Sequence, residues 1–185
     1  MLQSGRNYCS FYIQTEDPEE PFFENQLGAT STKDYAYYNQ LKLWKRMDRS
    51  FNYADAHCMT YPFRTGISWE KKLKPLIHER IDNSKNVLLL LSSITQETQQ
   101  MNEEMDYCIN VCGKPVIVVY VECQEQEEVF DAKGEVRGEL KQLWDQAPVF
   151  RDNMGKVFVQ HVPFNKQRIH EALNQVDVWL QNKIS

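Results

Sequence analysis

The chain has 185 residues, of which 42% are hydrophobic, and this is enough to build one domain with a proper core. Its net charge of −5 gives no overall attraction to nucleic acid or to an acidic membrane surface. No apolar run approaches the roughly 18 residues that span a bilayer. Residues 1–7 lack the apolar core of a signal peptide, so we expect a cytoplasmic protein with neither nucleic-acid nor membrane partners.

The N-terminal half predicts two strands and two helices in alternation. Residues 8–13 predict a short aromatic strand, and a helix follows Ser31, where Ser-Thr-Lys-Asp resembles a capping box. Residues 51–56 predict a second strand. Ser68 caps the second predicted helix, and Pro75 should kink or split it.

Two unbroken apolar strands are predicted at residues 87–91 and 116–121, with a helix between them. A strand that is apolar on both faces must be covered on both faces, as in a parallel sheet. The crossover between parallel strands is usually a helix. Ser93 and Gln96 predict a capping box where this helix begins. We expect residues 87–91 to be the central strand of the sheet.

The C-terminal third begins with a polar insertion or irregular excursion around residues 122–155, within which the apolar spacing of Leu140–Trp144 indicates a short helix. Residues 157–162 predict a fifth strand, and Asn165 caps a final amphipathic helix. The predicted fold is α/β. It is a single domain over residues 1–185, with a flavodoxin-like, five-stranded, mainly parallel sheet in the order 2-1-3-4-5 and helices on both faces.

The third predicted helix carries the main candidates for chemistry. Ligands of doubly wound sheets bind beyond the carboxyl ends of the strands. The helix that leaves the end of the 87–91 strand carries Glu103 and Glu104. A structural explanation is also open, because acids near the N-terminal end of a helix complement its dipole.

Other common sites are not indicated. Cys108 and Cys112 lie on one helix face without a second pair at a spacing typical of zinc, so we expect reduced thiols and no metal site. Gly28, Gly66 and Gly113 are isolated, and the chain has no glycine-rich phosphate loop. A Rossmann or P-loop nucleotide site is therefore not predicted.

Several short motifs follow one another in a distinctive order. They are Ser10-Phe11-Tyr12, Phe51 to His57, Asn83-Ser84 before the third strand, Glu104 on the next helix, Gly113 to Ile117, and His161 to Phe164. In this order and spacing they resemble the TIR-like family, and more narrowly the TIR-like proteins of the bacterial Thoeris anti-phage defence system. The resemblance covers residues 7–121 and 156–180, and no single motif decides it.

This resemblance implies an enzyme that cleaves the bond between nicotinamide and ribose in NAD and makes a cyclic or conjugated ADP-ribose signal. NAD is then a substrate, and no cofactor is expected. The family's catalytic Glu falls on Glu104 by helix register, with Glu103 as a competitor. Gln100 occupies the position, four residues earlier, where many TIR domains carry Trp. The resemblance also implies self-assembly or a phage-derived activator, and a downstream effector that is reached through a diffusible nucleotide.

A single carboxylate suits this chemistry. Loss of nicotinamide leaves an oxocarbenium-like ribose, and nicotinamide is already a cationic leaving group, so no general acid is needed. Ser10 belongs to the first predicted strand and is expected to contact the substrate. Phe11 is either a stacking wall for nicotinamide or adenine, or a core aromatic. Asp55 and His57 are either ribose contacts or turn formers.

Two further functions stay open. The first is a non-catalytic TIR-like module for interaction or assembly, which Gln100 in place of an aromatic favours. The second is a nucleoside deoxyribosyltransferase-like enzyme, which shares a related sheet and a Glu nucleophile. That enzyme needs further active-site carboxylates and an Asp or Tyr near the first strand that binds the substrate. The end of this strand offers Gln14, Glu16 and Asp17, so the composition does not exclude it.

Overall fold

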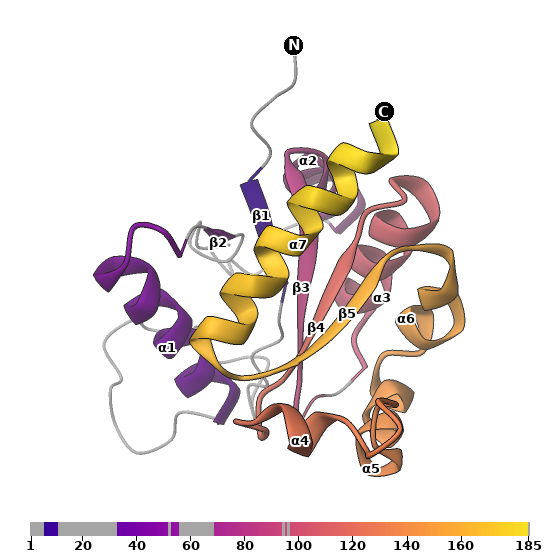
Figure 1. The fold of residues 1–185 in the computed structure, drawn as a ribbon. Coiled ribbons are helices and arrows are strands. Elements are labelled where there is room, and N and C mark those ends of the chain that lie inside the picture. The colour runs from indigo at the N-terminus through magenta and orange to yellow at the C-terminus, as the bar shows by residue number, and fades with distance from the viewer. Residues whose placement is uncertain are drawn as a thin grey trace.

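The computed structural model describes residues 6–10, 33–51, 53–55, 69–93, 95 and 97–184. Its strands form one parallel sheet in the order β2-β1-β3-β4-β5. They are β1 (Arg6–Ser10), β2 (Ala54–Asp55), β3 (Ser84–Leu91), β4 (Val116–Tyr120) and β5 (Val159–Pro163). The predicted α/β class and the central place of β3 are confirmed (Figure 1).

The helices alternate with the strands, as expected for right-handed parallel crossovers. They are α1 (Lys33–Met47), α2 (Lys74–Asp82), α3 (Gln99–Asp106), α4 (Gln126–Val129), α5 (Gly138–Lys141), α6 (Pro148–Asn153) and α7 (Lys166–Ile184). Shorter helical turns are η1 (Trp69–Leu73), η2 (Tyr107–Val111), η3 (Gln142–Gln146) and η4 (Met154–Lys156). The π-helical turn η1 gives way to α2 just before Pro75, which agrees with the predicted break.

The side chains of β3 divide the core into two layers. Val87, Leu89 and Leu91 pack in the first layer with α2, α3 and α6. Leu88 and Leu90 pack in the second layer with α1 and α7. This alternation is the period of two along a strand, and all five side chains are buried because helices cover both faces. Figure 1 shows α7 in front of the sheet and α3 behind it.

Two strand boundaries differ from the prediction. The first strand was predicted at residues 8–13, but β1 already begins at Arg6, and residues 11–13 lie outside the described part. The second strand is Ala54–Asp55 rather than 51–56. Phe51 and Tyr53 are instead buried in the second layer, so their apolar character reflects core packing and not a longer ladder.

The region around residues 122–155 contains the short segments α4, α5, η3 and α6. The predicted helix at Leu140–Trp144 is confirmed by α5 and η3. Val129 and Phe150 from this region are fully buried in the first layer. The excursion therefore contributes side chains to the core beside α3.

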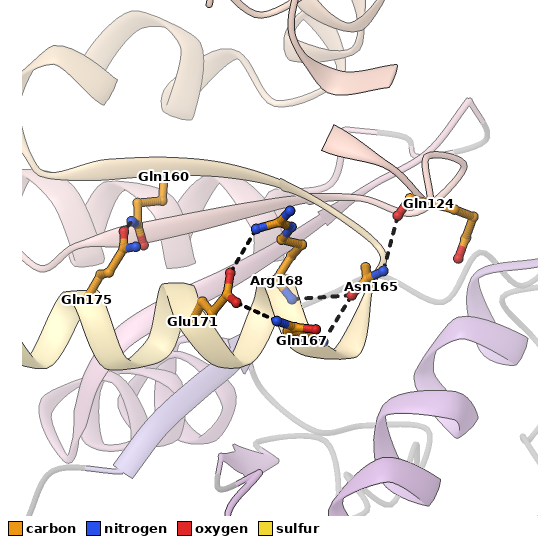
Figure 2. A network of polar contacts seen from close by, with 7 residues as sticks. All are labelled: Gln124, Gln160, Asn165, Gln167, Arg168, Glu171 and Gln175. Carbon is orange, nitrogen blue, oxygen red and sulfur yellow. Dashed lines mark hydrogen bonds and ion pairs between the residues drawn. The ribbon is translucent and has the colours of Figure 1, made fainter. Parts of the chain in front are cut away.

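Asn165 begins α7, as its position in the sequence predicts. Its Oδ1 accepts hydrogen bonds from the backbone N–H groups of Gln167 and Arg168 at 3.0 and 3.3 Å. Its Nδ2 donates to the carbonyl of Gln124, at the end of the turn after β4 (Figure 2). The cap thus satisfies free N–H groups of the helix and ties α7 to the edge of the sheet.

Within the described residues, no helix is both long and apolar enough to cross a membrane.

Candidate functional site

The turn after β3 is fixed by buried hydroxyl groups. The backbone N–H of Ser92 donates to Thr95 Oγ1 at 2.9 Å, and both side chains are almost fully buried. Ser93 Oγ donates to Glu122 Oε1 at 2.5 Å, and Glu122 lies just beyond β4. These contacts link the carboxyl ends of two adjacent strands at the edge where parallel sheets bind ligands.

Thr98, and not Ser93, caps the helix that follows. Thr98 Oγ1 accepts the backbone N–H of Met101 at 3.1 Å, and α3 begins at Gln99. The predicted capping box of Ser93 and Gln96 is therefore wrong. The physical reason is that the Ser93 hydroxyl is bonded to Glu122, a contact between segments far apart in the sequence.

Glu103 lies in an ion-pair network between α2 and α3. Lys74 Nζ lies 3.0 Å from Glu103 Oε2, and His78 Nε2 donates to Glu103 Oε1 at 2.7 Å. His78 in turn stacks on Tyr107 with ring centroids 3.6 Å apart. Burial opposes ionisation of Glu103, but the hydrogen bonds from His78 and Lys74 hold its pKa below the usual value. Its charge is thus used in joining two helices.

Glu104 has a different environment, although it is the next residue. Its side chain is 0% exposed. Gln100 Nε2 donates to Glu104 Oε1 at 2.9 Å. Gln100 precedes Glu104 by four residues, so both lie on one face of α3. Acidic residues are rarely fully buried unless they are hydrogen-bonded or paired, so Glu104 is unusual for a helix residue and is a candidate for a functional role.

The register of α3 shows which way Glu104 faces. Successive residues lie about 100° apart around a helix. Met101 and Met105 pack against the sheet in the first layer. Glu103 and Tyr107 contact α2. Glu104 lies on the arc between these two faces, at the junction of α3, α2 and the sheet.

The structure places the backbones of two predicted substrate residues on adjacent strands. Ser10 ends β1 and pairs with Leu89, and Asp55 ends β2 and pairs with Cys9. Both therefore lie at the carboxyl edge of the sheet. The side chains of Ser10 and Asp55 fall outside the described part of the structure, as do Phe11 and His57 entirely, so their predicted contacts stay predictions.

Cys108 lies one helical turn after Glu104 and is a buried, reduced thiol. Burial raises its pKa well above the usual value, and the nearby Lys114 opposes this only in part. A thiol of this kind is a poor nucleophile, because the thiolate is the reactive form. Among the described residues, no three His, Cys, Asp or Glu side chains are grouped so as to hold a metal ion.

The fold and this helix define an α/β protein with a buried carboxylate on the helix after the central strand. A match to the family described as Thoeris protein ThsB, TIR-like domain, covers residues 8–126, more than half of the chain. The chain belongs to this TIR-like family. The matched segment runs from β1 to the beginning of α4 and includes the whole of α3.

Sequence reasoning missed the residues that distinguish the two acids. Lys74 and His78 are four apart on α2, a spacing that brings both to one face, but nothing in the sequence pairs that face with Glu103. Gln100 and Glu104 have the same spacing within one helix, so their contact could have been predicted from position alone.

Proposed function

We propose that this chain is a TIR-type enzyme of anti-phage defence that cleaves the nicotinamide–ribose bond of NAD and makes an ADP-ribose-derived signal, cyclic or conjugated. Glu104 is the catalytic carboxylate in this proposal. The observation that carries it is the contrast between two neighbouring acids within a TIR-like domain. Glu103 forms an ion pair with Lys74 and a hydrogen bond with His78 between two helices, whereas Glu104 is fully buried at the junction of α3, α2 and the sheet.

The strand order favours a flavodoxin-like site. The chain runs from β1 to β2 on one side and then to β3 on the other, so its order reverses between β1 and β3. Ligands of such sheets bind beyond the carboxyl ends of the strands at this switch point. Ser10 ends β1, and α3 follows the end of β3. We propose that NAD binds there, with Ser10, Phe11, Asp55 and His57 among its contacts.

The proposed role of Glu104 is electrostatic. Cleavage of the glycosidic bond builds positive charge on the ribose, and a carboxylate placed beside it stabilises that charge. The interaction is stronger in a site without water, where the effective dielectric constant is low. Because Glu104 is fully covered in this conformation, turnover requires the residues over it to move. Self-assembly or a phage-derived activator would drive that movement, and the released nucleotide would carry the signal to an effector.

The test measures nicotinamide release from NAD by the purified protein, with and without lysate of phage-infected cells. Glu104→Gln should lower turnover by about 100-fold or more, because it keeps the shape of the side chain and removes its charge. Glu103→Gln is the matched control one residue away, and it should cost stability rather than turnover. Wild-type turnover by a folded Glu104→Gln protein contradicts the assignment, and selective loss in Glu103→Gln moves the role to Glu103.

The complete burial of Glu104 also favours a second candidate, a non-catalytic TIR-like module for interaction or assembly. The same assay separates the two functions. A module of this kind gives no nicotinamide even when the protein is concentrated, crowded or supplied with infected-cell lysate. The deoxyribosyltransferase-like alternative loses support, because the chain belongs to the TIR-like family.

A further inference from the structure

Gln100 is the polar partner that α3 itself supplies to Glu104. Its Nε2 donates to Glu104 Oε1 at 2.9 Å, from one turn earlier on the helix. A carboxylate has no proton to give, so the amide nitrogen of Gln100 must be the donor. This fixes the orientation of the Gln100 amide, with its nitrogen toward Glu104.

The bond matters because the carboxylate is fully buried. Glu104 has no contact with water, and burying a carboxylate without hydrogen bonds costs a large amount of folding free energy. A Glu side chain also has three rotatable bonds, and a bond to a neighbouring side chain restricts them. Gln100 therefore both compensates the buried charge and restricts the direction in which the carboxylate points.

The backbone of α3 around Gln100 and Glu104 is held in place by a helix cap and by core packing. Thr98 caps α3 two residues before Gln100. Met101 and Met105 are fully buried against the sheet and fix the rotation of the helix. The backbone positions of Gln100 and Glu104 are thus set by the core, and their side chains need only meet across one turn.

We propose that Gln100 is a positioning residue for Glu104: its side-chain amide holds the Glu104 carboxylate in the orientation needed to stabilise the ribose cation. This inference rests on the function proposed above. Gln100 is not itself expected to touch the reacting atoms. Many TIR domains carry an aromatic residue at the position of Gln100. In this chain the Gln100 amide would take its place and donate a hydrogen bond directly to Glu104.

The kinetic test compares Gln100→Leu with Gln99→Leu, which makes the same chemical change at the adjacent, exposed position. Gln100→Leu should lower kcat for nicotinamide release by about 10- to 100-fold with little change in KM, because a misdirected group costs rate rather than binding. Gln99→Leu should behave as the wild type. Gln100→His restores an N–H donor at a similar reach and should recover much of the lost kcat, which a merely structural role would not predict.

A second measurement needs no NAD. In protein labelled with 15N-glutamine, the side-chain amide of Gln100 is assigned as the signal that Gln100→Leu removes. Removing the charge in Glu104→Gln should shift this signal upfield, because a hydrogen bond to a charged acceptor is stronger than one to a neutral amide. Glu103→Gln should leave the signal in place.

The two measurements separate the possible failures. If the wild type cleaves NAD, an unchanged kcat in Gln100→Leu, or equal losses in Gln100→Leu and Gln99→Leu, overturns the positioning role. If the wild type releases no nicotinamide under any condition, the proposed function fails, and the amide signal alone decides whether Gln100 holds Glu104. If the side-chain amide signal of Gln100 does not shift in Glu104→Gln, the inference is overturned in either case.

Discussion

At the scale of single residues, neighbouring side chains of one type are given different properties by their surroundings. Glu103 and Glu104 are adjacent, but Glu103 forms an ion pair with Lys74 of α2, whereas Glu104 is fully buried and accepts a hydrogen bond from Gln100. The acids of the run after β4 differ in the same way. Glu122 accepts from Ser93, and the carboxylate of Glu128 accepts the backbone N–H groups of Gln124 and Glu125. Acidic residues that look alike in the sequence therefore have separate structural tasks.

His161 on β5 shows the same principle for a partly buried base. Trp144 Nε1 donates to Tyr120 OH at 2.9 Å, and Tyr120 OH lies 2.9 Å from His161 Nδ1. A Trp can only donate, so the Tyr120 oxygen accepts from it, and the Tyr120 O–H is free to donate to Nδ1. This direction fits a neutral imidazole with its proton on Nε2. Burial lowers the pKa of His161 to about 4.

The low pKa of His161 predicts a loss of stability in mild acid. In the unfolded chain the His161 imidazole binds a proton below about pH 6.5. In the native chain it stays neutral until the pH falls to about 4. The free energy of unfolding should therefore fall as the pH is lowered through this window, by about 3 kcal/mol for this group. His161→Gln keeps an acceptor and does not titrate there. Urea unfolding at several pH values should show a shallower pH dependence in this variant, and an unchanged slope contradicts the assignment.

At the scale of elements, the end of α2 is stabilised by a lysine from the loop before β4. Lys114 Nζ donates to the carbonyl groups of Ile81, Asp82 and Ser84, at 2.5, 2.8 and 2.5 Å. The last carbonyls of a helix have no partner within the helix and carry partial negative charge, so a cation there is favourable. The same lysine also fixes the turn from α2 into β3.

Lys114→Met should therefore lower the free energy of unfolding by about 2 to 4 kcal/mol, because it keeps the aliphatic stem and removes three charged hydrogen bonds. Lys133→Met is the control, since Lys133 is exposed in the turn between α4 and α5. The urea midpoints of both variants give the comparison. Equal midpoints for the two would show that water can replace the lysine at these carbonyls.

The elements that the sequence predicts best are those set by local chemistry. The unbroken apolar runs of β3 and β4 predict a covered parallel sheet, and Asn165 predicts the start of α7. The start of α3 was missed, because Ser93, Thr95 and Thr98 all have capping hydroxyls and the choice depends on Glu122 beyond the next strand. The different surroundings of Glu103 and Glu104 also depend on α2. The sequence could therefore name both acids as candidates, but the choice between them rested on the resemblance to the family.

At the scale of the whole molecule, one sheet joins two apolar layers. The layer of α2, α3 and α6 packs on one face, and the layer of α1 and α7 packs on the other. Trp144 contacts the first layer and Trp44 the second. Because β3, β4 and β5 contribute side chains to both layers, loss of packing in one layer should remove support from the other, which is the behaviour of a single domain.

This coupling leads to a test with Phe150, which comes from the excursion and is fully buried in the first layer. Phe150→Ala should cost about 3 to 5 kcal/mol through the cavity it leaves. In protein labelled with 5-fluorotryptophan, the 19F signals of Trp144 and Trp44 report the two layers separately. Both signals should lose their native form at one urea concentration, and Phe150→Ala should lower that concentration equally for both. A lower midpoint for Trp144 alone would mean that the excursion unfolds as a separate unit, and the chain would then not be the single domain that its sequence predicts.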